Sequence, residues 1–150
     1  IYPPPGMAVA DGAWLTAGAI CVAMAWGLTL LGRERNRAGS AVTLRICLLV
    51  APVLAAVGGF AMCMAAYAVG LDPTAHVYPA AVWALLIWLG AHVAGGIVMQ
   101  FYCLARSLAG HLTPRYDQDI WNVTLFWHFI MPMALVTALV IGVAPILMRG

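Results

Sequence analysis

The sequence predicts an all-α integral membrane protein, a four-helix bundle with both termini on the outer, periplasmic side. The first reason is composition: 65% of the 150 residues are hydrophobic and 8% are charged, whereas soluble domains carry about 25% charged residues. The second is that the charges are confined to short segments between four long apolar stretches. The third is the placement of the arginines. That placement accounts for the net charge of +2, so nucleic acid is not expected as a partner.

The four apolar stretches are each long enough to cross a hydrocarbon core of roughly 30 Å, which takes about 20 residues. A backbone in lipid must satisfy its own hydrogen bonds, so each stretch is expected to be a helix. The expected spans cover residues 13–32, 45–69, 78–106 and 120–148. Residues 1–12 are expected to form an extended outer segment, because three consecutive prolines exclude a helix there. Residues 13–150 are expected to form one domain.

Three features predict local structure within these stretches. Pro52 leaves a carbonyl of the second helix without its donor, which predicts a kink. Ala91 and Gly95 form a pair of small residues that favours close helix contact in the third. Pro132 lacks the N–H that the carbonyl of His128 would accept in the fourth.

The arginines set the orientation. The first loop holds four arginines against one acid, the second holds none, and the third holds Arg106 and Arg115. Positive residues favour the cytoplasm, so the first and third loops are expected inside and both termini outside. The basic residues Arg106, His111 and Arg115 of the third loop are candidates for anionic lipid headgroups. The alternative is that they serve orientation alone.

The four cysteines all lie in apolar stretches, and none forms a Cys-x-x-Cys pair. Buried apolar thiols are expected, and no metal site is expected in this chain.

The ionisable residues inside the spans are His92 and His128. One interpretation is a bis-histidine haem b site or a quinone site, although the two heights differ by about 7 Å. The other is interhelical hydrogen bonding, with His128 between Trp127 and Phe129. A proton path is weaker, because the spans contain no carboxylate. A third interpretation, a small transporter, is based only on the four helices and their prolines.

Two motifs around these histidines resemble a known family. Gly90-Ala-His-Val-Ala-Gly-Gly96 is similar to the Gly-x-His-Val-x-x-Gly pattern of cytochrome c oxidase subunit III, in its penultimate helix. Trp127-His128-Phe129 is similar to the Trp-His-Phe of that family's last helix. Tyr2-Pro-Pro-Pro-Gly-Met7 resembles the Trp-Pro-Pro-x-Gly-Ile segment that precedes its fourth helix. The whole chain thus resembles the C-terminal four helices of that subunit, although Met131 and Ala66 stand where the family has acids.

The resemblance implies an accessory, non-catalytic subunit of a haem-copper terminal oxidase in a bacterial inner membrane. It implies core subunits I and II as partners, which hold the haem and copper, and bound phospholipid; it implies no metal or haem in this chain. The histidines would then join the last two helices. The residues expected in that structural role are His92, His128, Trp127, Phe129, Thr124 and Gly96. The alternative is a haem b-binding or quinone-site membrane anchor that uses both histidines.

Overall fold

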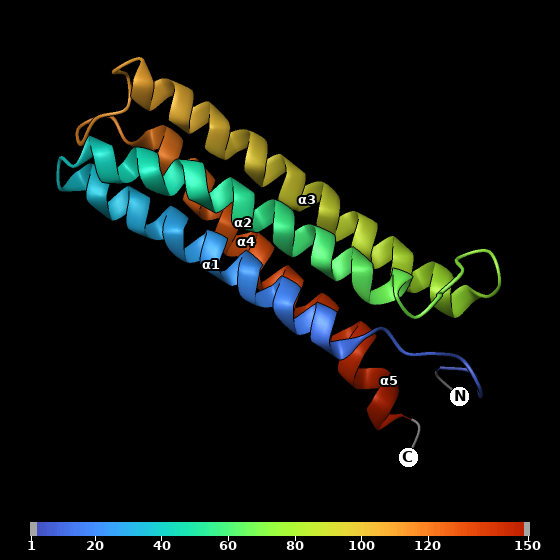
Figure 1. Ribbon diagram of the computed structural model, residues 1–150. Coiled ribbons are helices and arrows are strands. Elements are labelled where there is room, and N and C mark those ends of the chain that lie inside the picture. The colour runs from blue at the N-terminus through green and yellow to red at the C-terminus, as the bar shows by residue number, and fades with distance from the viewer. Residues whose placement is uncertain (1–2, 149–150) are drawn as a thin grey trace.

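Four long helices lie side by side, each antiparallel to the one before it in the chain (Figure 1). The computed structural model describes residues 3–148, so residues 1–2 of the expected outer segment and residues 149–150 lie outside it. The helices are α1 (Gly12–Arg37), α2 (Ala41–Tyr67), α3 (Val77–Leu108) and α4 (Gln118–Ala138). The fourth continues through a π-helical turn, η1 (Leu139–Val143), into α5 (Ala144–Leu147). Within residues 3–148 the chain forms helices and turns and no β-strand.

Each of the four helical rods is long and apolar enough to cross a membrane, the fourth counted from Gln118 to Leu147. This is the pattern of a multi-pass membrane protein. We call the end with the α1–α2 turn and the α3–α4 loop the arginine end. The other, which we call the terminal end, holds the segment before α1, the α2–α3 loop and α5 (Figure 1).

Each helix begins before the apolar stretch that predicts it, and α1 and α3 also end after it. The first continues through its arginines to Arg37 instead of ending at residue 32, because arginine is a good helix former. The second already begins at Ala41, so the first loop shrinks to residues 38–40. Gly39 has a φ of +81° there, a conformation that favours glycine. The arginine-rich segment therefore lies mostly on helical turns.

The segment before α1 is tied to the bundle. Its backbone makes a turn from Pro4 to Met7 (N···O 3.2 Å), so it is not extended throughout. The Asp11 carboxylate then caps α1 by accepting from the N–H groups of Ala13 (2.8 Å) and Trp14 (3.1 Å). The Asp11 N–H donates to the Ala65 carbonyl of α2 at 2.9 Å.

The α2–α3 loop is ordered by its own short side chains. The Asp72 carboxylate accepts from the hydroxyl (2.7 Å) and the N–H (2.8 Å) of Thr74. These two bonds hold the pKa of Asp72 below its ordinary value. The Trp83 indole donates to the Leu71 carbonyl at 2.7 Å, which fastens the loop to α3.

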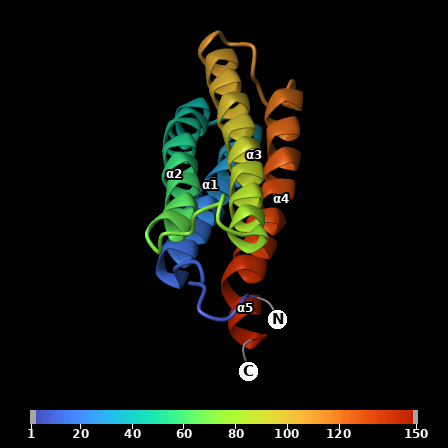
Figure 2. The same cartoon turned by 90° about the vertical axis from the view of Figure 1, so that its right-hand side faces the viewer.

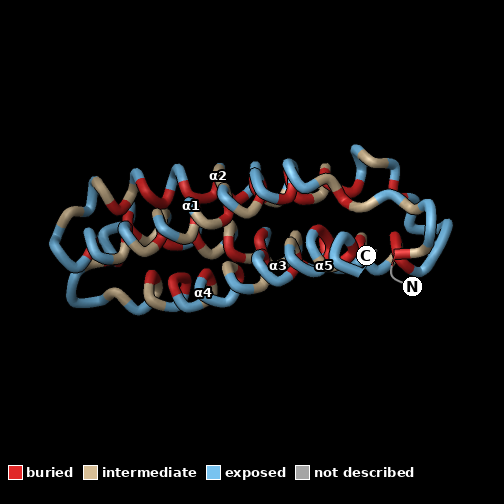
Figure 3. Tube along the Cα trace, turned by 90° about the horizontal axis from the view of Figure 1, so that it is seen from below, coloured by how far each residue is buried: buried red, intermediate tan, exposed pale blue. Residues whose placement is uncertain are grey.

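Buried residues recur at alternating spacings of three and four, the heptad spacing of helices that pack nearly parallel. Figure 3 shows this as buried turns facing inward along each helix. In α1 the buried residues are Leu15, Gly18, Val22, Ala25, Thr29, Gly32 and Asn36. In α3 the alternation runs through Leu86, Leu89, Val93, Gly96, Gln100, Cys103 and Ser107.

The helices form a ring in which α1 packs on α2, α2 on α3, α3 on α4, and α4 closes on α1. Figure 2 shows α3 in front and α1 behind, so these two are diagonal neighbours. The closest approach described is between α1 and α2. A Cβ added to Gly58 would lie 2.9 Å from the Gly18 carbonyl oxygen and 3.0 Å from Val22. Only glycine leaves room for these two backbones.

Gly58→Ala is expected to lower the free energy of unfolding by about 1–3 kcal/mol relative to Gly59→Ala, because its methyl group meets backbone that cannot move aside. A Cβ on Gly59 meets only Val93, at an ordinary 3.6 Å. Both variants gain the same helix propensity, so the comparison isolates packing. Circular dichroism during SDS titration in mixed micelles measures the difference; equal stabilities would contradict the close contact.

Candidate functional site

His92 lies in the seam between α3 and α4. Its Nδ1 is 2.8 Å from the Trp88 carbonyl oxygen one turn earlier. A carbonyl only accepts, so the neutral ring carries its proton on Nδ1 and leaves Nε2 as an acceptor. The ring centroid is 5.6 Å from that of Phe129 and 6.3 Å from that of Phe126, both on α4.

His128 repeats the local bond and faces a different helix. Its Nδ1 is 2.6 Å from the Thr124 carbonyl oxygen, which fixes the same tautomer. Its ring meets that of Trp26 on α1 edge to face, with centroids 5.6 Å apart and planes at 90°. The Thr124 hydroxyl donates to the Ile120 carbonyl at 2.7 Å. The Thr124 atom that contacts His128 is therefore the backbone carbonyl oxygen and not the hydroxyl.

The two histidines therefore lie in different seams. On a helix of 3.6 residues per turn, the His128 side chain leaves α4 about 130° away from the direction midway between Phe126 and Phe129. Both Nδ1 hydrogen bonds stay within one helix, and the contacts that these rings make between helices are aromatic. A single bis-histidine haem needs both imidazoles on one porphyrin, and this arrangement does not fit it.

The close contact between α3 and α4 is made by Gly96 and Trp127. Trp127 is completely buried. A Cβ on Gly96 would lie 3.0 Å from the Trp127 ring and 2.9 Å from the Ile130 side chain. Of the six residues expected to join these helices, Gly96, Trp127, His92 and Phe129 meet in this seam. The Thr124 hydroxyl is bonded within α4, and His128 contacts Trp26 of α1.

A polar pair that the sequence reasoning missed lies across the bundle. Gln100 of α3 is fully buried, and its Nε2 donates to the Thr29 hydroxyl of α1 at 2.8 Å. That hydroxyl donates to the Ala25 carbonyl at 2.8 Å. The Gln100 Oε1 is buried without a hydrogen-bond partner among the described residues. The available signal was spacing: Gln100 lies four residues after Gly96 and three before Cys103, on the buried stripe.

The arginines predicted to set orientation also join helices at the arginine end. Two of the contacts are ion pairs, Arg106 with Asp119 (3.0 Å) and Arg37 with Asp117 (3.2 Å). Arg45 donates a hydrogen bond to the Ser107 carbonyl (2.8 Å), and the Arg33 guanidinium lies 3.9 Å from the centroid of the Trp121 ring. Asn36 of α1 donates to the Thr113 carbonyl of the last loop at 3.2 Å. Such partly exposed pairs contribute about 0–1 kcal/mol each, so they fix geometry more than stability.

The three residues considered for lipid headgroups line one hollow of about 400 Å³, namely Arg106, His111 and Arg115. Asp117 and Asp119 line it too, and Arg106 is paired with Asp119. His111 and Arg115 are both exposed, and the Arg115 guanidinium lies 5.7 Å from the centroid of the Tyr116 ring.

Metal ligands are sparse. Over residues 3–148, no group of three or more His, Cys, Asp or Glu side chains is gathered closely enough to hold a metal ion. The four cysteines are free thiols, with Cys47 and Cys103 buried.

No protein-family model and no curated protein matches the chain.

Thr29→Val is expected to lower the free energy of unfolding by about 1–3 kcal/mol, because it leaves the buried Gln100 Nε2 without an acceptor. Gln100→Leu is expected to cost less than about 1 kcal/mol, because it removes the donor and the unpartnered Oε1 together. The double variant should be more stable than Thr29→Val alone. Unfolding in mixed micelles measures this cycle; additive losses would show that the pair does not interact.

Proposed function

We propose that this chain is an accessory, non-catalytic subunit of a haem-copper terminal oxidase in a bacterial inner membrane. It packs against core subunits I and II, which hold the haem and copper, and it binds phospholipid. Its own residues contribute helix packing to the complex and no catalytic step.

The observation that carries the proposal is the contact between the two motifs that resemble subunit III. The histidine of the first motif, His92, packs on Phe129 of the second, with ring centroids 5.6 Å apart. The last glycine of the first motif, Gly96, lies against Trp127 of the second. Segments 36 residues apart (128 − 92) therefore form one contact. The glycine, the tryptophan and the aromatic neighbour each have a packing reason to be there.

The outward faces of the bundle supply the surface for partners. On α2 the side chains of Val53, Val57 and Phe60 are exposed, and on α3 those of Val98 and Phe101. A face of this kind in a membrane is covered by acyl chains or by another transmembrane subunit. This surface is available to larger membrane subunits.

A tagged copy of the chain, extracted from native membranes in mild detergent, is expected to co-purify with a haem-copper oxidase core. Mass spectrometry and a reduced-minus-oxidised spectrum identify that core. Gly96→Leu is expected to lower the yield of complex several-fold by displacing Trp127. Gly90→Leu serves as the control, because nothing lies within 4 Å of a Cβ there. Purification without any haem-copper core would refute the proposal.

The same proposal places the arginine end in the cytoplasm. A cysteine at the exposed position His111 is then expected to react with an impermeant maleimide only after the cells are opened, and one at exposed Ala75 to react in intact cells. The native cysteines lie within helices, and the unsubstituted chain measures their background. Labelling of His111→Cys in intact cells would reverse the topology.

A further inference from the structure

The first turn of α3 is capped by a histidine. His76 is the last residue of the α2–α3 loop, its side chain is exposed, and its backbone is extended, with a φ of −163° and a ψ of 159°. Its Nδ1 accepts a hydrogen bond from the Tyr78 N–H at 3.1 Å. In most helices an oxygen of Ser, Thr, Asp or Asn takes this place. Here the acceptor is an imidazole nitrogen, which accepts only while it carries no proton.

The residues after His76 leave one amide for this cap. An N-cap side chain reaches the N–H groups of the second and third helical residues. The third residue of α3 is Pro79, which has no N–H. The fourth, Ala80, donates to the His76 carbonyl at 3.2 Å. The Tyr78 N–H is therefore the amide that the imidazole can satisfy, and no neighbouring amide replaces it when that bond breaks.

Few charged groups surround His76. In the described part of the terminal end, the carboxylates are Asp72 in the same loop and Asp11 before α1 (Figure 1). Each is bonded within its own segment, and neither forms an ion pair with His76. The adjoining ends of α2, α3 and α5 add the Tyr67 and Tyr78 phenols and no charged side chain. Histidine is the side chain whose charge ordinarily changes between about pH 5 and 8, so His76 is the group that responds there.

Protonation of His76 has two effects on this turn, and both have the same sign. A proton on Nδ1 turns the acceptor into a donor, so the bond from the Tyr78 N–H is lost. The new positive charge lies at the N-terminus of α3, where the helix dipole favours negative charge. The cap therefore stabilises the turn at neutral pH, and this stabilisation is lost as the pH falls and His76 takes up a proton.

We propose that His76 is a pH-sensitive cap, which ties the α2–α3 loop to α3 when the imidazole is neutral and releases it when the imidazole is protonated. The released segment covers residues 72–77. It is bounded on one side by Leu71, whose carbonyl accepts from the Trp83 indole at 2.7 Å, and on the other by the buried side chain of Tyr78. The order of this segment then follows the pH of the compartment that the terminal end faces. The inference does not depend on the proposed oxidase role.

The test is amide hydrogen exchange of the whole chain in detergent micelles, measured by NMR at about pH 5 and about pH 7.5. Each rate is divided by that of an unstructured peptide at the same pH, which removes the intrinsic pH dependence of exchange. Protection of the Tyr78 N–H is expected to be roughly twofold to thirtyfold lower at the acid pH, the range that loss of an N-cap gives.

The Thr74 N–H provides an internal reference in the same loop. It donates to the Asp72 carboxylate at 2.8 Å, and the two bonds from Thr74 hold the pKa of Asp72 below its ordinary value. Asp72 is therefore ionised at both pH values, and this local bond persists when the segment is released. Protection of the Thr74 N–H is expected to stay constant.

Three variants complete the design. His76→Asn keeps a capping acceptor that does not titrate, and Tyr78 is expected to keep equal protection at both pH values. His76→Ala has no acceptor, and protection is expected to be low at both. His111→Asn, at the arginine end, is the matched control and is expected to keep the change seen in the unsubstituted chain.

Circular dichroism at each pH checks that the variants are folded. Where His76→Ala does not fold, the comparison of the unsubstituted chain with His76→Asn decides the matter. Equal protection of the Tyr78 N–H at both pH values in the unsubstituted chain would overturn the proposal. So would a pH dependence that persists in His76→Asn, or an equal fall in protection at Thr74, since the response would then not arise at the cap.

Discussion

The close approach of helix backbones is the constraint on which this bundle depends. Apolar side chains gain little by leaving lipid for another helix, so association in a membrane relies on van der Waals contact at short range. The structure meets this demand with glycine where two helices come nearest. Gly58 lies against the Gly18 carbonyl, and Gly96 lies against the Trp127 ring. The heptad spacing of the buried residues in α1 and α3 then keeps one face of each helix turned inward along its length.

Polar contacts fix what apolar packing leaves free. A heptad stripe allows neighbouring helices to slide by a turn at modest cost, whereas a directed hydrogen bond is satisfied in one register only. The Gln100 to Thr29 bond sets the height of α3 against its diagonal neighbour α1. At the arginine end, the Arg37 to Asp117 and Arg106 to Asp119 pairs set the height of α4 and its loop. These few groups define the alignment of α1, α3 and α4.

The sequence was sufficient to predict the helical class and the four apolar rods, because hydrophobic length and charge exclusion are local properties. It placed helix ends less well, since the arginines after Gly32 remain helical although they are not apolar. The meeting of Gly96 and Trp127 was accessible from motif spacing. The contact of His128 with Trp26 of α1 could not be predicted from motif spacing. It depends on which face of α4 packs against α1, and that is a property of the whole bundle. Gln100 carries no charge and so does not stand out as the ionisable groups do, but its spacing from Gly96 and Cys103 places it on the buried face of α3.

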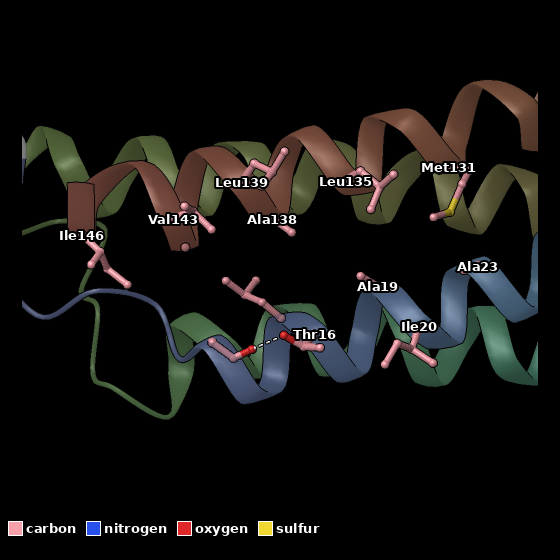
Figure 4. Close-up of a pocket in the computed structure, with 13 residues that line it drawn as sticks. Thr16, Ala19, Ile20, Ala23, Met131, Leu135, Ala138, Leu139, Val143 and Ile146 are labelled. Atoms are coloured by element: carbon pink, nitrogen blue, oxygen red, sulfur yellow. Dashed lines mark hydrogen bonds between the residues drawn. The ribbon is translucent and has the colours of Figure 1, made fainter. Parts of the chain in front are cut away.

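The last helix is the least regular, and its irregularity has a chemical cause. Pro132 leaves the His128 carbonyl without its helical donor, and Pro145, the second residue of the helix that follows η1, has no N–H to donate to it. A π turn contains one more residue than an α-helical turn. The extra residue rotates the direction of every side chain after it. Both Gly142 and Val143 of this turn line an apolar hollow of about 460 Å³ between α1 and the last helix (Figure 4). Small residues of α1, among them Ala19 and Ala23, lie on the other side of this hollow.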